Sequence, residues 1–290
     1  METHKKVWLV TGSGNGLGRN IVEAALQAGH AVVATARNTK QLDDLSVQYG
    51  SQILIAELDV TDESQAKEVV KLAFDTFGHI DVLVNNAGYG DNRPFEQVPA
   101  EEFRKLVETC FFGVVTLTRE VLPLMRQQRS GHIIQISSGG GRMATAGNAA
   151  YHASKWAIGG FTEGLAQETA TFNVKVTALE PGGMRTNWGK RAFKNTIELL
   201  PEYEPTIGAT IKYLETYWGH ENSDPNKVAQ IILKISEADQ VPPHILIGSD
   251  AYTLAKEASE KRWQDAEQWK EVSEYADFES HMVLPDFLKK

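Results

Sequence analysis

Cysteine is almost absent from this sequence: Cys110 is the only one in 290 residues. A single cysteine cannot form an intramolecular disulfide, and such a composition is typical of a protein in a reducing compartment. The eight histidines are scattered, with no HxxxH pair, and no CxxC motif occurs. We therefore expect no metal site.

Long apolar runs and an excess of positive charge are also missing. No stretch is long enough to span a bilayer, and the apolar run after the N-terminal lysines is too short for a signal sequence. The formal net charge of −9 argues against a nucleic-acid partner and against an anionic membrane surface. We expect a cytoplasmic protein that acts on a small molecule.

What the sequence does have is an apolar fraction of 42%, enough to bury a large core. Short apolar runs alternate with helical patterns over residues 1–180, which predicts a parallel sheet with helices on both faces. Helical spacing over 17–29 follows the first run, and Gly29 is its natural stop. Strand patterns occur at 6–10, 31–36, 52–58, 81–88, 132–138, 174–183 and 244–248.

The pattern changes after Gly183. Residues 184–225 mix aromatic and polar side chains with Pro201 and Pro205, which predicts a small helical lid over a substrate. Core packing is the alternative role of these aromatics, and we expect it for part of them. A charged C-terminal extension with helical spacing runs from about Tyr252 to residue 290 and loosens around Pro285. No linker is visible, so we expect a single domain over 1–290.

A glycine-rich turn joins the first strand to the first helix. In "TGSGNGLG", residues 11–18, glycines let the backbone turn tightly and let a pyrophosphate approach the N-terminus of the helix. An ordinary Gly-rich turn is the alternative, but the position between a strand and a helix favours a dinucleotide site. The spacing is Gly-x3-Gly-x-Gly, not the usual Gly-x-Gly-x-x-Gly.

Six motifs follow one another at characteristic spacings: "TGSGNGLG", "LDV" (58–60), "NNAG" (85–88), "ISS" (136–138), "YHASK" (151–155) and "PGGMRT" (181–186). In this order they resemble the short-chain dehydrogenases/reductases over roughly residues 5–190. "HILIGSDA" (244–251) extends the match weakly, and the later part is similar to the 17β-hydroxysteroid-dehydrogenase-like branch. The resemblance implies a Rossmann-type doubly wound sheet and an oxidoreductase.

Tyr151 and Lys155 stand four residues apart, so a helix would place them on one face. Free tyrosine has a pKa near ~10, and a nearby ammonium group should lower that pKa by favouring the phenolate. The resemblance implies that Tyr151 is the general acid/base and that Lys155 also binds the nicotinamide ribose. It further implies that Ser138, by itself an ordinary strand-end residue, holds the substrate oxygen.

The resemblance also implies a cofactor site along the carboxyl ends of the strands. Asp59 lies where the family contacts adenine; its alternative role is to cap the next helix, which Thr61 or Asp62 could also do. We expect the following residues to bind the cofactor: Gly12, Ser13, Asn15, Gly16, Leu17, Gly18, Arg37, Asn38, Asp59, Val60, Asn86, Ala87, Gly88, Tyr151, Lys155, Pro181, Gly182, Met184 and Thr186.

The end of the second strand predicts which cofactor is used. NAD-binding relatives usually carry a carboxylate there, which bonds the ribose hydroxyls. This chain has Ala36 and then Arg37, whose guanidinium is placed to bind a 2′-phosphate. The sequence therefore predicts NADP(H), unless Arg37 points to solvent.

Together these features predict an NADP(H)-dependent carbonyl reductase or alcohol dehydrogenase that acts on an apolar ketone, aldehyde or secondary alcohol. The alternatives are an NADP(H)-binding sensor or scaffold with little turnover, and a sugar-nucleotide epimerase, whose glycine spacing usually differs. Helices around 100–128 and 150–171 form four-helix interfaces in many relatives, which suggests a homodimer or homotetramer. Packing on the sheet would also explain their apolar faces.

One position departs from the family pattern. Most relatives carry an asparagine three residues before a glycine in the long central helix, where it helps to hold a water that links the lysine to solvent. The matching stretch "TCFFG", residues 109–113, has Cys110 there. A thiol is a weaker donor and acceptor than an amide, so we expect that water to be held less firmly.

Overall fold

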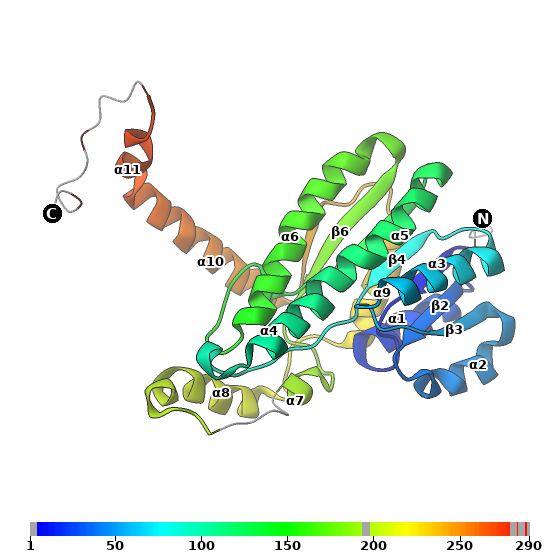
Figure 1. Ribbon diagram of the computed structural model, residues 1–290, viewed down its shortest axis with the longest axis horizontal. Helices are drawn as coiled ribbons and strands as arrows, with labels where there is room; N and C mark the ends of the chain where they lie inside the picture. The colour runs from blue at the N-terminus through cyan, green and yellow to red at the C-terminus, as the bar shows by residue number, and fades with distance from the viewer. Residues whose placement is uncertain (1–4, 193–197, 279–282, 284–287, 289–290) are drawn as a thin grey trace.

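The computed structural model describes residues 5–192, 198–278, 283 and 288. Its centre is a sheet of seven parallel strands in the order β3-β2-β1-β4-β5-β6-β7 (Figure 1). The strands are β1 Val7–Val10, β2 Ala31–Ala36, β3 Ile53–Glu57, β4 Val82–Asn85, β5 Gly131–Ile136, β6 Val174–Pro181 and β7 His244–Ile247. Every predicted strand pattern forms a strand, and the predicted doubly wound fold is confirmed. The order in which successive strands are added to the sheet reverses between β1 and β4, and sheets of this type bind ligands at that point.

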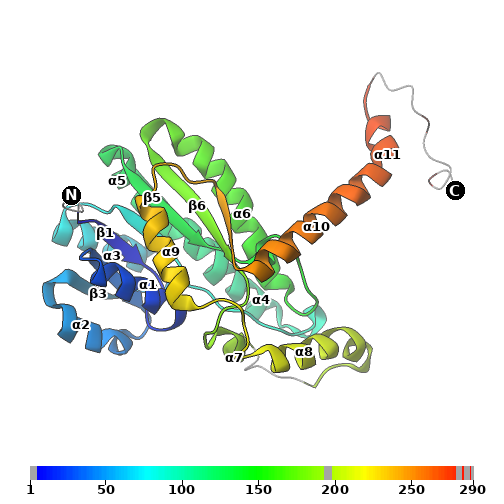
Figure 2. The ribbon, with the colours of Figure 1, turned by 180° about the vertical axis from the view of Figure 1, so that it is seen from behind.

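Helices cover both faces of the sheet, because successive strand residues point to opposite sides and both sides are apolar. Val10 and Val32 pack on one face against α1 Gly16–Gln27, α2 Asp43–Tyr49 and α9 Pro225–Glu237. Leu9 and Val33 pack on the other against α3 Glu63–Phe77, α5 Gly113–Gln128 and α6 Ala149–Thr169. Figure 2 shows α9 and α1 on the face opposite to α5 and α6.

Local signals fix the ends of these helices. Asp62 caps α3, since its carboxylate accepts hydrogen bonds from the backbone N–H groups of Ser64 at 2.9 Å and Gln65 at 3.0 Å. Asp62 is therefore the N-cap among the three candidates Asp59, Thr61 and Asp62, and Asp59 does not cap this helix. Gly29 has φ +87° just after α1, as expected for a helix stop.

The chain leaves the sheet at the carboxyl end of β6 and forms the predicted helical excursion. It contains α7 Trp188–Ala192, a 3-10 turn Pro201–Tyr203, a π-turn Glu204–Gly208 and α8 Ala209–Tyr217 (Figure 1). Residues 193–197 of the predicted lid lie outside the described residues. We call the described part of 184–225 the lid.

The C-terminal helices are α10 Ser249–Gln268 and α11 Lys270–Tyr275. They form an arm that projects away from the sheet in both views (Figures 1 and 2). Ala251 and Ala255 are buried at the start of α10, and Arg262 farther along donates to the Arg142 carbonyl at 2.9 Å and lies 5.0 Å from the centre of the Trp156 ring. The predicted change around Pro285 lies outside the described residues. No helix in the described part of the chain is long and apolar enough to cross a membrane.

Candidate active site

The glycine-rich loop lies at the carboxyl end of β1 and leads into the N-terminus of α1. Gly12 and Gly16 have φ values of +67° and +57°, a region that side chains rarely adopt. A methyl group on Gly18 would lie 2.4 Å from the carbonyl oxygen of Gly12. The loop therefore depends on glycine at these places, and its exposed edge, which includes Asn15, faces the open end of the sheet.

Several residues predicted to bind a cofactor hold this loop in shape. The hydroxyl of Ser13 is buried and donates to the carbonyl of Val10 at 2.9 Å. The Asn86 amide donates to the carbonyls of Thr11 at 2.9 Å and Gly12 at 3.2 Å. Ala87 comes within 2.9 Å of a methyl group built on Gly12, so the end of β4 packs directly against the turn. Leu17 is buried beneath it.

The ends of β2 and β3 lie beside one another at this edge, where the sequence predicts the adenosine part of a cofactor. Arg37 and Asn38 are exposed directly after β2, and the Asn38 side chain accepts a hydrogen bond from the Lys40 N–H at 3.2 Å. Burial opposes ionisation of Asp59, but hydrogen bonds from Thr61 and the charge of Arg37 outweigh it and lower the pKa of Asp59. Val60 is buried next to Asp59. The ionised Asp59 carboxylate and the exposed Arg37 guanidinium therefore both lie at this edge.

The structure brings Ser138, Tyr151 and Lys155 together between β5 and α6. Ser138 follows the end of β5, and its hydroxyl accepts the N–H of Gly140 at 3.0 Å. Lys155 is buried, with its Nζ 2.6 Å from the carbonyl of Ile136 and 5.5 Å from the centre of the Tyr151 ring. Gly88 lies against the same ammonium group, since a methyl group on it would be 3.9 Å from Nζ.

The direction of the Tyr151 pKa shift differs from the expectation. Burial raises the pKa of Tyr151 above its usual range; hydrogen bonding with Ser138 opposes the rise, and the Cys110 thiol adds to it. Burial also lowers the pKa of Lys155. The prediction that the Lys155 ammonium group would lower the pKa of Tyr151 is therefore wrong. Burial has the largest effect on the pKa of both groups, and it favours the neutral form of each. The phenol therefore keeps its proton at neutral pH.

His152 follows Tyr151 in the sequence and was given no role there. Its Nδ1 lies 2.8 Å from the Gly140 carbonyl oxygen, and its Nε2 accepts the N–H of Thr145 at 3.0 Å. These bonds tie α6 to the loop that carries Ser138. Sequence reasoning missed them because nothing in "YHASK" shows which loop the imidazole meets.

Cys110 is fully buried in a π-turn, Glu108–Phe112, that joins α4 Ala100–Val107 to α5. Its sulfur accepts the N–H of Tyr89 at 3.4 Å and donates to the carbonyl of Tyr89 at 3.3 Å. Burial raises the pKa of Cys110, so it stays a neutral thiol. It anchors the loop after β4 beside Lys155.

The segment after β6, which begins the lid, lies beside Tyr151 and the glycine-rich loop. The Trp188 ring centre is 5.1 Å from that of Tyr151. Thr186 lies close to Gly16 of the glycine-rich loop, and both line a cavity of about 360 Å³ together with Arg185 and Lys190. Pro181 is buried at the end of β6, Gly182 bonds to Ile247, and Met184 bridges to Ser223.

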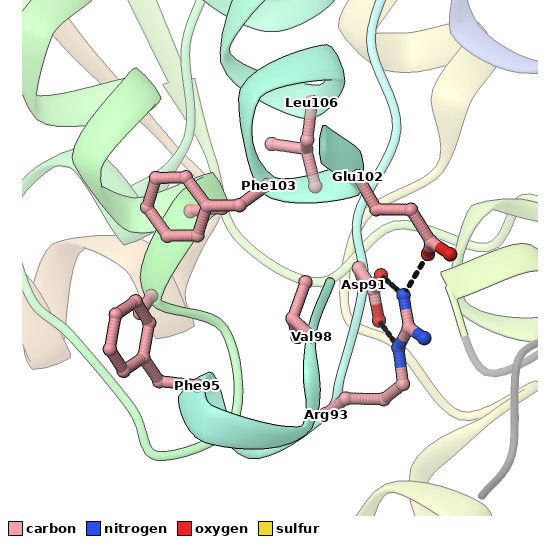
Figure 3. A pocket seen from close by; sticks show the side chains of 9 residues that line it. Asp91, Arg93, Phe95, Val98, Glu102, Phe103 and Leu106 are labelled. Carbon is pink, nitrogen blue, oxygen red and sulfur yellow. Dashed lines mark hydrogen bonds and ion pairs between the residues drawn. The ribbon is translucent and has the colours of Figure 1, made fainter. Parts of the chain in front are cut away.

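A second wall lies between the loop after β4, α4 and the start of α6 (Figure 3). Phe95 and Phe103 meet edge to face at 5.8 Å around a cavity of about 10 Å³, enough for one water at most. Arg93 forms ion pairs with both Asp91 and Glu102, and Arg93 itself is buried. The sequence did not reveal this cluster, which fixes the loop rather than offering a free charge. Among the described residues, no group of three or more His, Cys, Asp or Glu side chains could hold a metal ion.

Comparison with known proteins agrees with this geometry. The family model "short chain dehydrogenase" matches residues 6–196. Oxidoreductase BOA17 of Botryotinia fuckeliana (strain B05.10) is 43% identical over 92% of this chain and 98% of its own. 3-Ketodihydrosphingosine reductase of Bacteroides thetaiotaomicron is 31% identical over 89% of this chain and 93% of its own. The crystal structure of a short-chain dehydrogenase from Streptomyces avermitilis superimposes with a TM-score of 0.88, at 39% identity, covering 94% of this chain and 100% of that one.

Proposed function

Since the chain belongs to the short-chain dehydrogenase family, we propose that this oxidoreductase is an NADP(H)-dependent carbonyl reductase or alcohol dehydrogenase. The observation that carries the proposal is the cluster of Ser138, Tyr151 and Lys155 at the carboxyl end of the sheet. A protonated phenol beside a hydroxyl and a buried ammonium group is suited to giving a proton to a carbonyl oxygen.

The residues divide the work of reduction in this proposal. When bound, NADP(H) supplies or accepts the hydride, so it carries the redox chemistry. Ser138 would donate a hydrogen bond from its hydroxyl to the substrate oxygen and keep its proton, because the Gly140 N–H occupies only an acceptor position of that hydroxyl. Tyr151 gives its proton to the same oxygen, and the charge of Lys155 stabilises the phenolate that remains. In the reverse direction Tyr151 takes the proton from an alcohol.

The residues of the sheet edge fit a dinucleotide. The loop leaves no room for side chains at Gly12 and Gly18, requires a positive φ at Gly16, and ends at a helix N-terminus, which favours a pyrophosphate. Asp59 and Val60 would lie at the adenine, and Pro181, Gly182, Met184 and Thr186 at the nicotinamide side. Lys155 and Tyr151 would meet the nicotinamide ribose.

The preference for NADP(H) rests on Arg37. Replacing Arg37 by alanine should lower kcat/KM for NADPH by about 5- to 150-fold, the equivalent of ~1–3 kcal/mol for a charge-assisted pair. The value for NADH should change little, because NADH lacks the 2′-phosphate. Steady-state kinetics with both cofactors measure this. Equal kcat/KM for the two cofactors in the native protein would contradict the proposal.

The proposed substrate is apolar. Trp188 against Tyr151 and the Phe95–Phe103 pair give the approach to the phenol an aromatic lining. A relative of this chain carries a name that describes reduction of a 3-keto compound, 3-ketodihydrosphingosine. We propose that the lid packs on the apolar part of the substrate while its carbonyl reaches Tyr151.

A panel of ketones, aldehydes and quinones with NADPH tests the function directly. Oxidation of NADPH that depends on the carbonyl compound is the expected result. Cofactor fluorescence followed in the same samples separates the failures: tight NADPH binding without turnover on any compound would favour a sensor or scaffold instead. A homodimer or homotetramer in the cytoplasm remains our proposal for its assembly and location.

Cys110 offers a further test of the site. Replacing it by asparagine should preserve the fold and leave kcat unchanged or higher, because an amide offers donors and an acceptor to the Tyr89 backbone. Cys110→Ala is the matched control: it removes both contacts and should cost about 1–3 kcal/mol of stability. A large loss of kcat in Cys110→Asn at an unchanged melting temperature would instead assign a specific role to the thiol.

A further inference from the structure

The loop between β5 and α6 carries Ser138, whose hydroxyl hydrogen-bonds with the Tyr151 phenol and with the Gly140 N–H. Ser138 lies at the start of a short 3-10 turn, Gly139–Gly141, and the loop runs on through Thr145 to Asn148 before α6 begins. The hydroxyl accepts the N–H of Gly140 at 3.0 Å, so its direction depends on the position of Gly140 as well as on that of Tyr151. Whatever holds Gly140 therefore also aims Ser138.

His152 holds Gly140 from behind. Its Nδ1 is 2.8 Å from the Gly140 carbonyl oxygen, and a methyl group built on Gly140 would come within 2.9 Å of the same nitrogen. The ring thus occupies the space that a side chain at Gly140 would need. Its Nε2 accepts a hydrogen bond from the Thr145 N–H at 3.0 Å and lies 3.1 Å from the Thr145 hydroxyl. One imidazole therefore contacts the loop at two places, Gly140 and Thr145.

These partners determine the protonation of the ring. A backbone N–H can only donate, so Nε2 must be the unprotonated acceptor. A carbonyl oxygen can only accept, so Nδ1 must carry the proton. Burial also lowers the pKa of His152, which keeps the ring neutral.

We propose that His152 is a positioning residue: its neutral, Nδ1-protonated imidazole clamps Gly140 and Thr145 and thereby aims the Ser138 hydroxyl at the substrate oxygen. This proposal rests on the proposed function of Ser138. The chain of contacts runs from the His152 ring through Gly140 to Ser138, while Tyr151, the neighbour of His152, reaches the same oxygen from the helix. One turn of α6 would then set the relative positions of both groups that hold this oxygen.

Two substitutions of the same residue separate the clamp from simple packing. His152→Phe keeps an aromatic ring but makes neither bond, and it should lower kcat by about 10- to 100-fold, as small misplacements at reacting atoms do. His152→Gln keeps a donor and an acceptor and should restore most of that loss. The Kd for NADPH should stay within about twofold of native in both, since the glycine-rich loop is untouched.

A double-mutant cycle shows whether the effect passes through Ser138. If it does, adding His152→Phe to Ser138→Ala should lower kcat by less than about threefold, because the group being aimed is already gone. If the fold-loss of kcat in the double variant equals the product of the fold-losses in the two single variants, the proposal is overturned. His132→Gln is the control: it changes another buried imidazole, at the far end of β5, and should leave kcat unchanged.

The tautomer gives a readout that does not depend on turnover. Long-range ¹H–¹⁵N spectra of the native protein at neutral pH should show His152 protonated at Nδ1 and free at Nε2. A ring protonated at Nε2 would overturn the clamp even if every variant loses activity or fails to fold. A native protein without carbonyl reduction would sink the proposed function, whereas an active native protein with an equally active His152→Phe would sink this inference alone.

Discussion

Replacing Tyr151 by phenylalanine should lower turnover by about 10²- to 10⁴-fold, the range that general acid–base catalysis contributes. The substitution keeps the ring and its packing on Trp188 at 5.1 Å but removes the proton donor. Because burial raises the pKa of Tyr151, the native phenol is held in the form that can donate. Single-turnover oxidation of NADPH with excess carbonyl substrate isolates this step from product release.

Binding of NADPH should survive in the same variant, since Lys155 and the glycine-rich loop are unchanged. Titration of cofactor fluorescence should give a Kd within about twofold of native. Tyr49→Phe is the matched control, because Tyr49 packs at the end of α2 on the sheet and its hydroxyl has no part in the proposed chemistry. Near-native turnover in Tyr151→Phe would show that another group supplies the proton.

The fold followed from the sequence because its signals are local and repeated. Val10 and Leu9 pack on opposite faces of the sheet, so strands such as β1 read as unbroken apolar runs, which is how a doubly covered parallel sheet is identified. The cap at Asp62 and the stop at Gly29 depend only on neighbouring residues, and both were readable. The lid was predicted as a helical excursion, but its π-turn at Glu204–Gly208 left no mark in the sequence.

The site was less readable where a property depends on residues distant in the chain. The shift of the Tyr151 pKa was predicted in the wrong direction because spacing shows that Lys155 is near, but not how little water reaches either group. Asn86 was expected at the cofactor, and the sequence did not show that its amide also bonds the backbone of the glycine-rich loop. The clamp made by His152 depends on a loop that folds back onto α6, a contact that no periodicity encodes.

Replacing Gly18 by alanine should weaken NADPH binding by about 10- to 100-fold and lower the free energy of unfolding by about 1–3 kcal/mol. The added methyl group would lie 2.4 Å from both the Gly12 carbonyl oxygen and the Asn86 amide nitrogen. Neither can move alone, because Asn86 donates to that same carbonyl and Gly12 already has φ +67°. The turn would have to open, which would displace the N–H groups that face the proposed pyrophosphate.

Gly164→Ala is the control for this prediction. Gly164 lies in α6 with nothing within 4 Å of an added methyl group, so alanine there should raise stability by about 0.5–1 kcal/mol. Its Kd for NADPH should not change. Cofactor titration and thermal unfolding of both variants distinguish a distorted glycine-rich loop from an unfolded protein. The expected result is a folded Gly18→Ala protein that binds NADPH weakly. Unchanged affinity in Gly18→Ala would mean that this loop does not hold the cofactor, because a turn as tight as this one cannot accept the methyl group without moving.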